Sequence, residues 1–65
     1  MTTDKILALA RKHLGGDMES SARLCLADSI KLLNQGDMAS ARRRALDSLQ
    51  YSIGILHPDY IRATK

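Results

Sequence analysis

Apolar residues recur at intervals of three and four along most of the chain, which is the period of one face of an α-helix. The first such run covers residues 3–14, with Ile6, Leu7, Ala10 and Leu14 on one side. A broader apolar stripe follows over residues 17–35, and a third extends over residues 37–56. The pattern predicts an all-α fold of three helices.

Glycine and aspartate mark the boundaries between these stretches. Gly15 and Gly16 follow the first run, and Gly36 follows the second, where glycine ends a helix by adopting a positive φ. Asp17 and Asp37 then stand where an N-cap side chain accepts from the first amides of the next helix. Because the turn at Gly36 is so short, the second and third helices are expected to form an antiparallel αα-hairpin.

The apolar pattern and the turn residues lead to further expectations. Pro58 should end the third helix, and Leu33 and Leu49 should lie at the core centre because each is in the middle of its stripe. The stretches GDMESSARLCLADS and GDMASARRRALDS resemble each other with one residue deleted, although two similarly capped helices produce much of this likeness by chance. Residues 1–65 form one small domain, and the pattern leaves open whether the first helix packs on the hairpin.

The composition limits how the fold is stabilised. A domain of this size buries only about 60% of the surface that its unfolded chain exposes. Cys25 is the only cysteine, so an internal disulfide is excluded, and two histidines with one cysteine offer no recognised metal-ligand spacing. We expect neither a metal nor a cofactor, and stabilisation by packing or by a partner.

Charge and hydropathy limit where the protein is expected to act and which partners it is expected to bind. The net charge of +3 is compatible with an acidic partner without requiring one. The apolar runs are only a few residues long, and the start MTTDKILALA lacks a long apolar signal region. We expect a cytoplasmic protein that does not enter a membrane.

Catalytic chemistry finds little support in the residues. The LDSL motif around Ser48 is similar to the modified serine of carrier proteins, but here it lies in mid-helix after three arginines. His13 and His57 lie at helix ends, where histidine commonly contacts terminal carbonyls. No set of nucleophile, base and orienting residue can be assembled, so no enzyme and no catalytic residue is expected.

The most unusual local feature is the run of Arg42, Arg43 and Arg44. Consecutive residues on a helix point in three directions and do not form one patch. Arg43 should point to solvent beside Asp47, while the stem of Arg42 should cover the edge of the core.

Arg44 lies instead on a flank of the third helix, in line with Tyr51 and Ile55. Tyrosine and arginine are over-represented among interface anchors, so we predict that Arg44, Tyr51 and Ile55 bind a partner. The alternative is that the first helix or residues 59–65 cover Tyr51 and Ile55.

Two family resemblances suggest what such a module does. The stretch QGDMASARRRALDSL resembles the turn and second helix of a tetratricopeptide repeat, with Gly36 and Ala41 at the family's separation. The chain departs from the family's pattern at Ser29, which precedes this stretch, and at Ala45 and Ser48 within it. Over most of the chain, the hairpin and the closing run ALDSLQYSIGIL are similar to the small co-chaperones of type III secretion needle subunits. That resemblance implies a short cytoplasmic hairpin that pairs with a tetratricopeptide-like chaperone.

Two functions therefore remain open. The first is a non-catalytic protein-interaction module, an adaptor or co-chaperone that binds a partner helix or helical-repeat protein in a hetero-complex or as a homodimer. The alternative is a small basic nucleic-acid-binding protein of the helix-turn-helix kind, with the third helix as reader. The tight turn and the long third helix favour the first. The sequence names neither the partner nor the oligomeric state.

Overall fold

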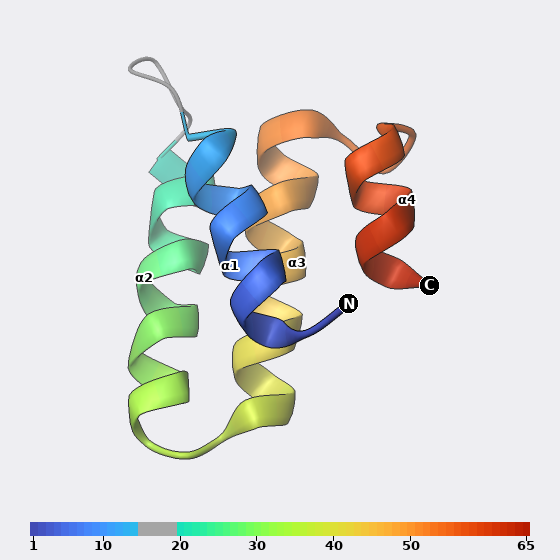
Figure 1. Ribbon diagram of the computed structural model, residues 1–65. Coiled ribbons are helices and arrows are strands. Elements are labelled where there is room, and N and C mark those ends of the chain that lie inside the picture. Colours follow the sequence, from blue (N-terminus) through green and yellow to red (C-terminus); the bar gives the residue numbers. More distant parts are fainter. Residues whose placement is uncertain (15–19) are drawn as a thin grey trace.

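The computed structural model describes residues 1–14 and 20–65 of the chain, and these residues are helical apart from short connections. Four helices follow one another in these ranges: α1 Thr3–Lys12, α2 Ser20–Asn34, α3 Met38–Ile53 and α4 Pro58–Thr64 (Figure 1). The described residues contain no strand, which confirms the all-α prediction. The predicted number of three helices is wrong, because α4 follows the third.

The fourth helix exists because Pro58 begins a helix instead of ending one. Proline suits the first helical position, where its missing N–H would have no partner in any case. His57 is extended and caps α4, its Nδ1 accepting a hydrogen bond from the Asp59 amide at 3.0 Å. α3 has already ended at Ile53, and the next residue, Gly54, takes a φ of 82°. The predicted helix over 37–56 is therefore too long at its C-terminal end.

The other helix ends agree more closely with the sequence. α1 begins after Thr2, whose side chain accepts from the Lys5 amide at 3.3 Å, and it ends at Lys12, short of the predicted 3–14. The described part of α2 lies within the predicted 17–35. The predicted stop at Gly15 and Gly16 and the predicted cap at Asp17 lie outside the described residues.

The turn between α2 and α3 has the predicted conformation. Gly36 has a φ of 85°, and Asp37 caps α3 by accepting from the Ser40 amide at 3.1 Å. A Cβ added at Gly36 would meet no atom within 4 Å, so the positive φ alone requires glycine here. Both predictions for this turn are confirmed.

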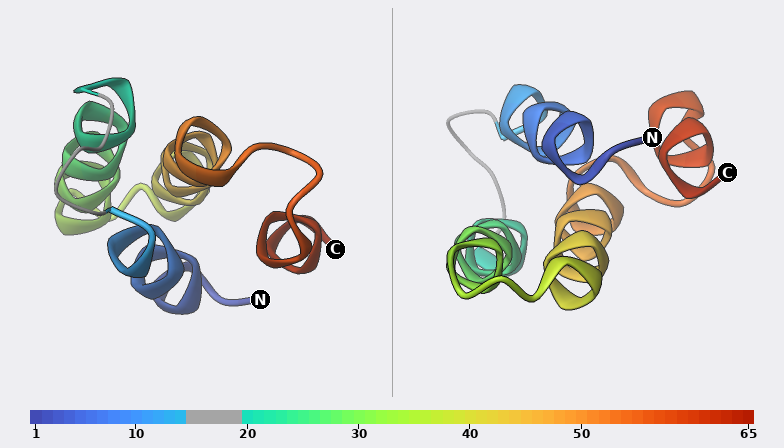
Figure 2. Two further views of the ribbon diagram at one scale, coloured as in Figure 1. Left: turned by 90° about the horizontal axis from the view of Figure 1, so that it is seen from above. Right: turned by 60° about the horizontal axis from the view of Figure 1, so that its bottom comes forward.

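α1 packs across α2 and α3, which settles a point that the sequence left open. α2 and α3 lie side by side and share the most extensive contact, and α1 contacts α3 more than it contacts α2 (Figures 1 and 2). α4 stands against α3, away from α2, and the N-terminus lies between α1 and α4 (Figure 2).

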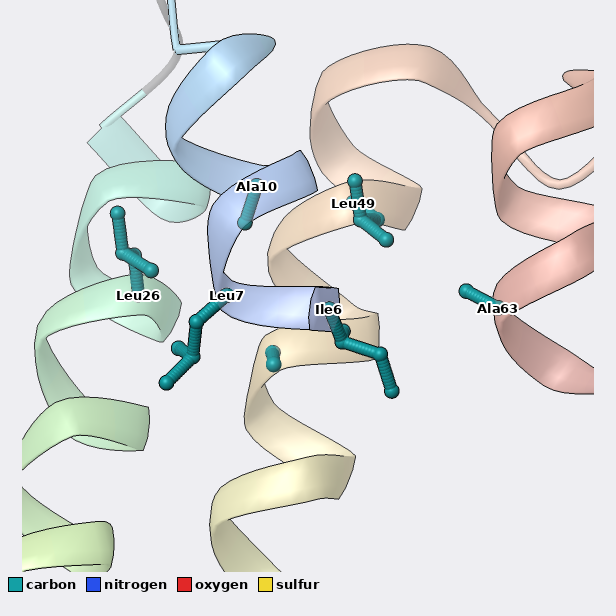
Figure 3. Close-up of a cluster of buried hydrophobic side chains, with 7 residues drawn as sticks. Ile6, Leu7, Ala10, Leu26, Leu49 and Ala63 are labelled. Atoms are coloured by element: carbon teal, nitrogen blue, oxygen red, sulfur yellow. The ribbon is translucent and has the colours of Figure 1, made fainter. Parts of the chain in front are cut away.

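The apolar core lies where α1, α2, α3 and α4 meet. Ile6 and Leu49 are fully buried, while Leu33 is half-buried and packs against the core from its edge. The prediction of a central position is thus confirmed for Leu49 and wrong for Leu33. The buried cluster consists of Ile6, Leu7, Ala10, Leu26, Ala45, Leu49 and Ala63 (Figure 3).

Two buried serines join α2 to α3. Ser29 Oγ donates to the Ala41 carbonyl at 2.5 Å, and Ser48 Oγ donates to the Ala22 carbonyl at 2.8 Å. All four residues are fully buried, and such small side chains let two helix backbones approach closely. The two bonds relate equivalent residues of the repeated stretches, since SARLCLADS contains Ala22 and Ser29 while SARRRALDS contains Ala41 and Ser48. The serine of each stretch therefore donates to the alanine carbonyl of the other stretch.

Candidate functional site

Two of the three predicted site residues lie on the outer side of α3. The side chain of Arg44 is 48% exposed, and Tyr51 is 52% exposed. They are seven residues apart, which places them on the same helix face about two turns from each other. Tyr51 is therefore not covered by α1 or by residues 59–65, contrary to the alternative interpretation of the sequence.

Ile55 does not lie on α3, so the predicted alignment of three residues on one helix is wrong. Gly54 ends the helix one residue before it, and the amide of Gly54 donates to the Gln50 carbonyl as the last helical bond. Ile55 instead occupies a turn that closes with a 3.4 Å bond from the His57 amide to the Gly54 carbonyl. Gly54, four residues before Pro58, is the sequence signal that the helix ends before Ile55.

This turn exposes two large apolar side chains, Ile55 and Leu56, which we call the turn tip. Ile55 is 55% exposed and Leu56 is 85% exposed, the highest value among the exposed large apolar residues that the structure describes. Tight turns are usually built from glycine, proline, asparagine, aspartate and serine. Leu56 was not predicted as a site residue because the sequence pattern assigned it to the apolar stripe of an over-long helix.

Arg44 has its own surroundings beside α2. Its Nη1 forms an ion pair with Asp47 Oδ2 at 3.5 Å, so Asp47 pairs with Arg44 and not with Arg43 as the helical spacing predicted. Arg44 also lines a shallow hollow of about 330 Å³ at the junction of α2 and α3. The α2 side of this hollow is formed by Asp28, Lys31, Leu32 and Gln35. Arg44 therefore borders α2 as well as lying on α3.

The three arginines differ in their contacts, although Arg43 and Arg44 line one hollow together with Ser40 and Asp47. Arg42 is half-buried, and its guanidinium donates to the Met1 carbonyl and, at 3.5 Å, to the Ala63 carbonyl. A cation at the C-terminal end of α4 is favoured by the helix dipole. Arg43 is exposed and has no hydrogen bond or ion pair among the described residues. Arg42 thus makes structural contacts, Arg43 is solvated and Arg44 is ion-paired.

Both histidines of the chain meet at Asp59, an arrangement that the sequence did not predict. His13 Nε2 lies 2.9 Å from Asp59 Oδ2, and the His13 and His57 rings are in edge contact with centroids 5.3 Å apart. Arg62 donates to the second carboxylate oxygen of Asp59. The hydrogen bonds from His13 and then Arg62 hold the pKa of Asp59 below the ordinary value of 3.8. An ionised carboxylate is only an acceptor, so His13 Nε2 carries the proton.

This cluster holds α4 against α1. The described residues provide no group of three or more His, Cys, Asp or Glu side chains arranged to hold a metal ion. Ser48, the serine of the carrier-like motif, and Ser29 are fully buried between α2 and α3, and Cys25 is buried. The nucleophilic side chains of Ser29, Ser48 and Cys25 are therefore not accessible from solvent.

Comparisons with known proteins find no match for this chain. No family model fits the sequence, and no curated protein or solved structure is significantly similar to it. Each helix within 1–14 and 20–65 is too short or too polar to cross a lipid bilayer.

Proposed function

We propose that this chain is a non-catalytic protein-interaction module, of the adaptor or co-chaperone kind, that acts in the cytoplasm on a partner protein. The observation that carries the proposal is the turn tip, which presents Ile55 and Leu56 to solvent. Burying two such side chains in a partner's pocket would supply the apolar centre that interfaces require.

In this proposal α2 and α3 act as an antiparallel αα-hairpin that supports the binding surface. The reciprocal serine bonds support it, because they join Ala22 near the start of α2 to Ser48 near the end of α3, and Ser29 to Ala41 near the start of α3. A rigid support lowers the entropy lost on binding. Tyr51, half-exposed near the end of α3, would extend the apolar contact, and Arg44 would add a polar contact at the rim.

The nucleic-acid alternative has weaker support in the surroundings of the arginines. Phosphate binding needs several cations with donors to spare. Arg42 donates to two backbone carbonyls and Arg44 shares one N–H with Asp47, which leaves Arg43 as the one unpaired cation of the triplet and Arg44 as a partly neutralised one. The support therefore favours an apolar contact over a charge-driven one.

The test compares two exposed leucines after a partner has been recovered by cross-linking in the source cells and purified. Leu56→Gln should weaken binding about tenfold or more, since it removes a central apolar contact. Leu24→Gln is the matched control, because Leu24 is 66% exposed on α2 and outside the proposed surface. Equal affinities for the Leu56→Gln variant and the unmodified chain would contradict the proposal.

A second arm addresses nucleic acid directly, with binding to mixed DNA and RNA measured over a range of salt concentrations. We expect binding of the recovered partner to be weakened by Tyr51→Ala and unchanged by Arg43→Ala. Salt-dependent losses of similar size at Arg43→Ala and Arg44→Ala, with none at Tyr51→Ala, would instead indicate a phosphate contact.

A further inference from the structure

A second surface, distinct from the turn tip, lies between α1 and α4. It is a shallow groove of about 320 Å³, on the side where the N-terminus passes between the two helices (Figure 2). Its floor is apolar, with the half-buried Leu9 and the single methyl group of Ala8. The described residues that line it are Met1, Lys5, Ala8, Leu9, Lys12 and Arg62.

Both walls of the groove are held in place. The α1 wall is fixed by Ile6 and Ala10, which are fully buried on the other side of the helix. The α4 wall is fixed by the fully buried Ala63 and by the contact of Asp59 with His13. A groove with fixed walls needs little rearrangement to accept a ligand.

The rim of the groove is cationic. Lys5 and Lys12 are exposed on α1, and Arg62 faces them from α4 with its side chain 65% exposed. No carboxylate is among the described lining residues. Arg62 gives one N–H to Asp59, and a guanidinium has five, so most of its donors are available to another acceptor.

We propose that this groove binds an acidic amphipathic helix of a partner protein. Lys5 and Lys12 are seven residues apart, about 10.5 Å along α1, which matches two acidic residues two turns apart on a helix lying beside it. Ala8, between them, lets the partner backbone approach closely, and Leu9 and Met1 form the floor for its apolar stripe. The resulting contact follows the helix-in-groove mode of recognition.

An anionic membrane would not match this floor. Amphipathic helices that lie on membranes insert large apolar side chains some 5–10 Å into the interface. Here Ala8 offers only a methyl group and Leu9 is half-buried, so Met1, 38% exposed, is the one large apolar side chain at the surface of the lining. The groove therefore favours a peptide over a lipid surface.

The experiment uses two designed peptides of about four helical turns. One has leucines at helical spacing flanked by glutamates, and the other carries lysine at each glutamate position. Fluorescence anisotropy should show saturable binding of the acidic peptide only. Lys5→Glu should raise its Kd about fivefold or more, and Ala8→Gln, which fills the floor, should raise it about tenfold.

Two control variants match these changes outside the groove. Lys31→Glu makes the same change in net charge on α2, and Ala27→Gln makes the same exposed substitution there. Each should leave the Kd within about twofold, while NMR shift changes on peptide addition should concentrate at Lys5, Ala8, Lys12 and Arg62.

Several results would overturn the proposal. These are equal binding of the lysine peptide, equal losses for Lys5→Glu and Lys31→Glu, or no effect of Ala8→Gln. Binding to phosphatidylserine vesicles without binding to the acidic peptide would replace the partner helix with a membrane. None of these results bears on the turn tip, which lies elsewhere.

Discussion

α2 and α4 both pack against α3, but they use different kinds of side chain. The α2–α3 contact is made of small buried residues, with Ala22, Ser29, Ala41 and Ser48 all fully buried. Each of its two polar groups is satisfied inside the contact by a carbonyl of the other helix. The contact extends along both helices (Figure 1).

α4 is attached by fewer apolar atoms and by charged groups. Ala63 is its one fully buried apolar residue, and Tyr60 is only partly buried against the core. The rest of the attachment is polar: His13 with Asp59, and Arg42 with the Ala63 carbonyl. A seven-residue helix is too short to be stable alone, so these contacts hold α4 in place.

The difference predicts that this small chain has a stable part, α2 with α3, and a part that is released more easily, α4. Apolar packing responds little to pH, whereas contacts through a carboxylate depend on its ionisation. Because α4 forms one wall of the cationic groove, its attachment also determines whether that groove exists. We therefore predict that the α2–α3 contact mainly determines stability, whereas the attachment of α4 mainly determines binding to the groove.

The largest effect is expected at Leu49, which is fully buried where α1, α3 and α4 meet. Leu49→Ala should lower the free energy of unfolding by about 2–5 kcal/mol, because it leaves a cavity that the short helices cannot close. Leu33→Ala should cost less, since Leu33 is half-buried. Urea denaturation followed by circular dichroism measures both.

A domain this small has little stability to lose, so Leu49→Ala is paired with a milder change. Leu49→Met keeps the side-chain volume and should cost less than about 1.5 kcal/mol. A Leu49→Ala variant with the denaturation midpoint of the unmodified chain would contradict the assigned core.

Much of the fold could be predicted from the sequence because apolar period and turn residues report local structure. The stripes of the first three helices, the positive φ at Gly36 and the cap at Asp37 were all available in this way. α4 was not predicted, because seven residues are too few for a periodic pattern and proline marks either end of a helix. The contact of His13 with Asp59 joins residues 46 positions apart, which no local pattern reveals.

The candidate surface was predicted only in part, for a related reason. Helical projection placed Arg44 and Tyr51 on the outer side of α3, where both are half-exposed. Ile55 and Leu56 were placed wrongly because the same projection was continued past Gly54. The cationic groove combines α1 with a helix that was not predicted, so its lining could not be assembled from the sequence.

The second prediction measures the two serine bonds across the α2–α3 contact. Ser29→Ala and Ser48→Ala should each lower the free energy of unfolding by about 1 kcal/mol, and the double variant should show roughly the sum because the sites lie apart. Ser52→Ala is the control, since Ser52 donates within α3 to the Ser48 carbonyl at 2.7 Å. Urea titration of the four variants makes the comparison, and equal losses at Ser52 and Ser48 would show that the interhelical bonds contribute nothing specific.

The smallest and most local effect on stability is expected when acid protonates Asp59. Its pKa is lower in the folded chain than the ordinary 3.8, because His13 and Arg62 donate to the ionised carboxylate. A carboxyl group with a lowered folded pKa stabilises the fold fully above its unfolded pKa, and this contribution disappears as the pH falls through the folded pKa. We therefore expect α4 to stay attached at pH 5 and to loosen below pH 3.8.

NMR shifts of the Tyr60 and Ala63 amides, followed during an acid titration, measure this release. They should move towards random-coil values while the amides of Ser29 and Ser48 keep their folded positions, because the α2–α3 serine bonds contain no ionisable group. Asp59→Asn removes the titrating group, so its α4 signals should show no acid transition of their own. If all four amides instead reached random-coil values at one common pH, the two regions would unfold as a single unit.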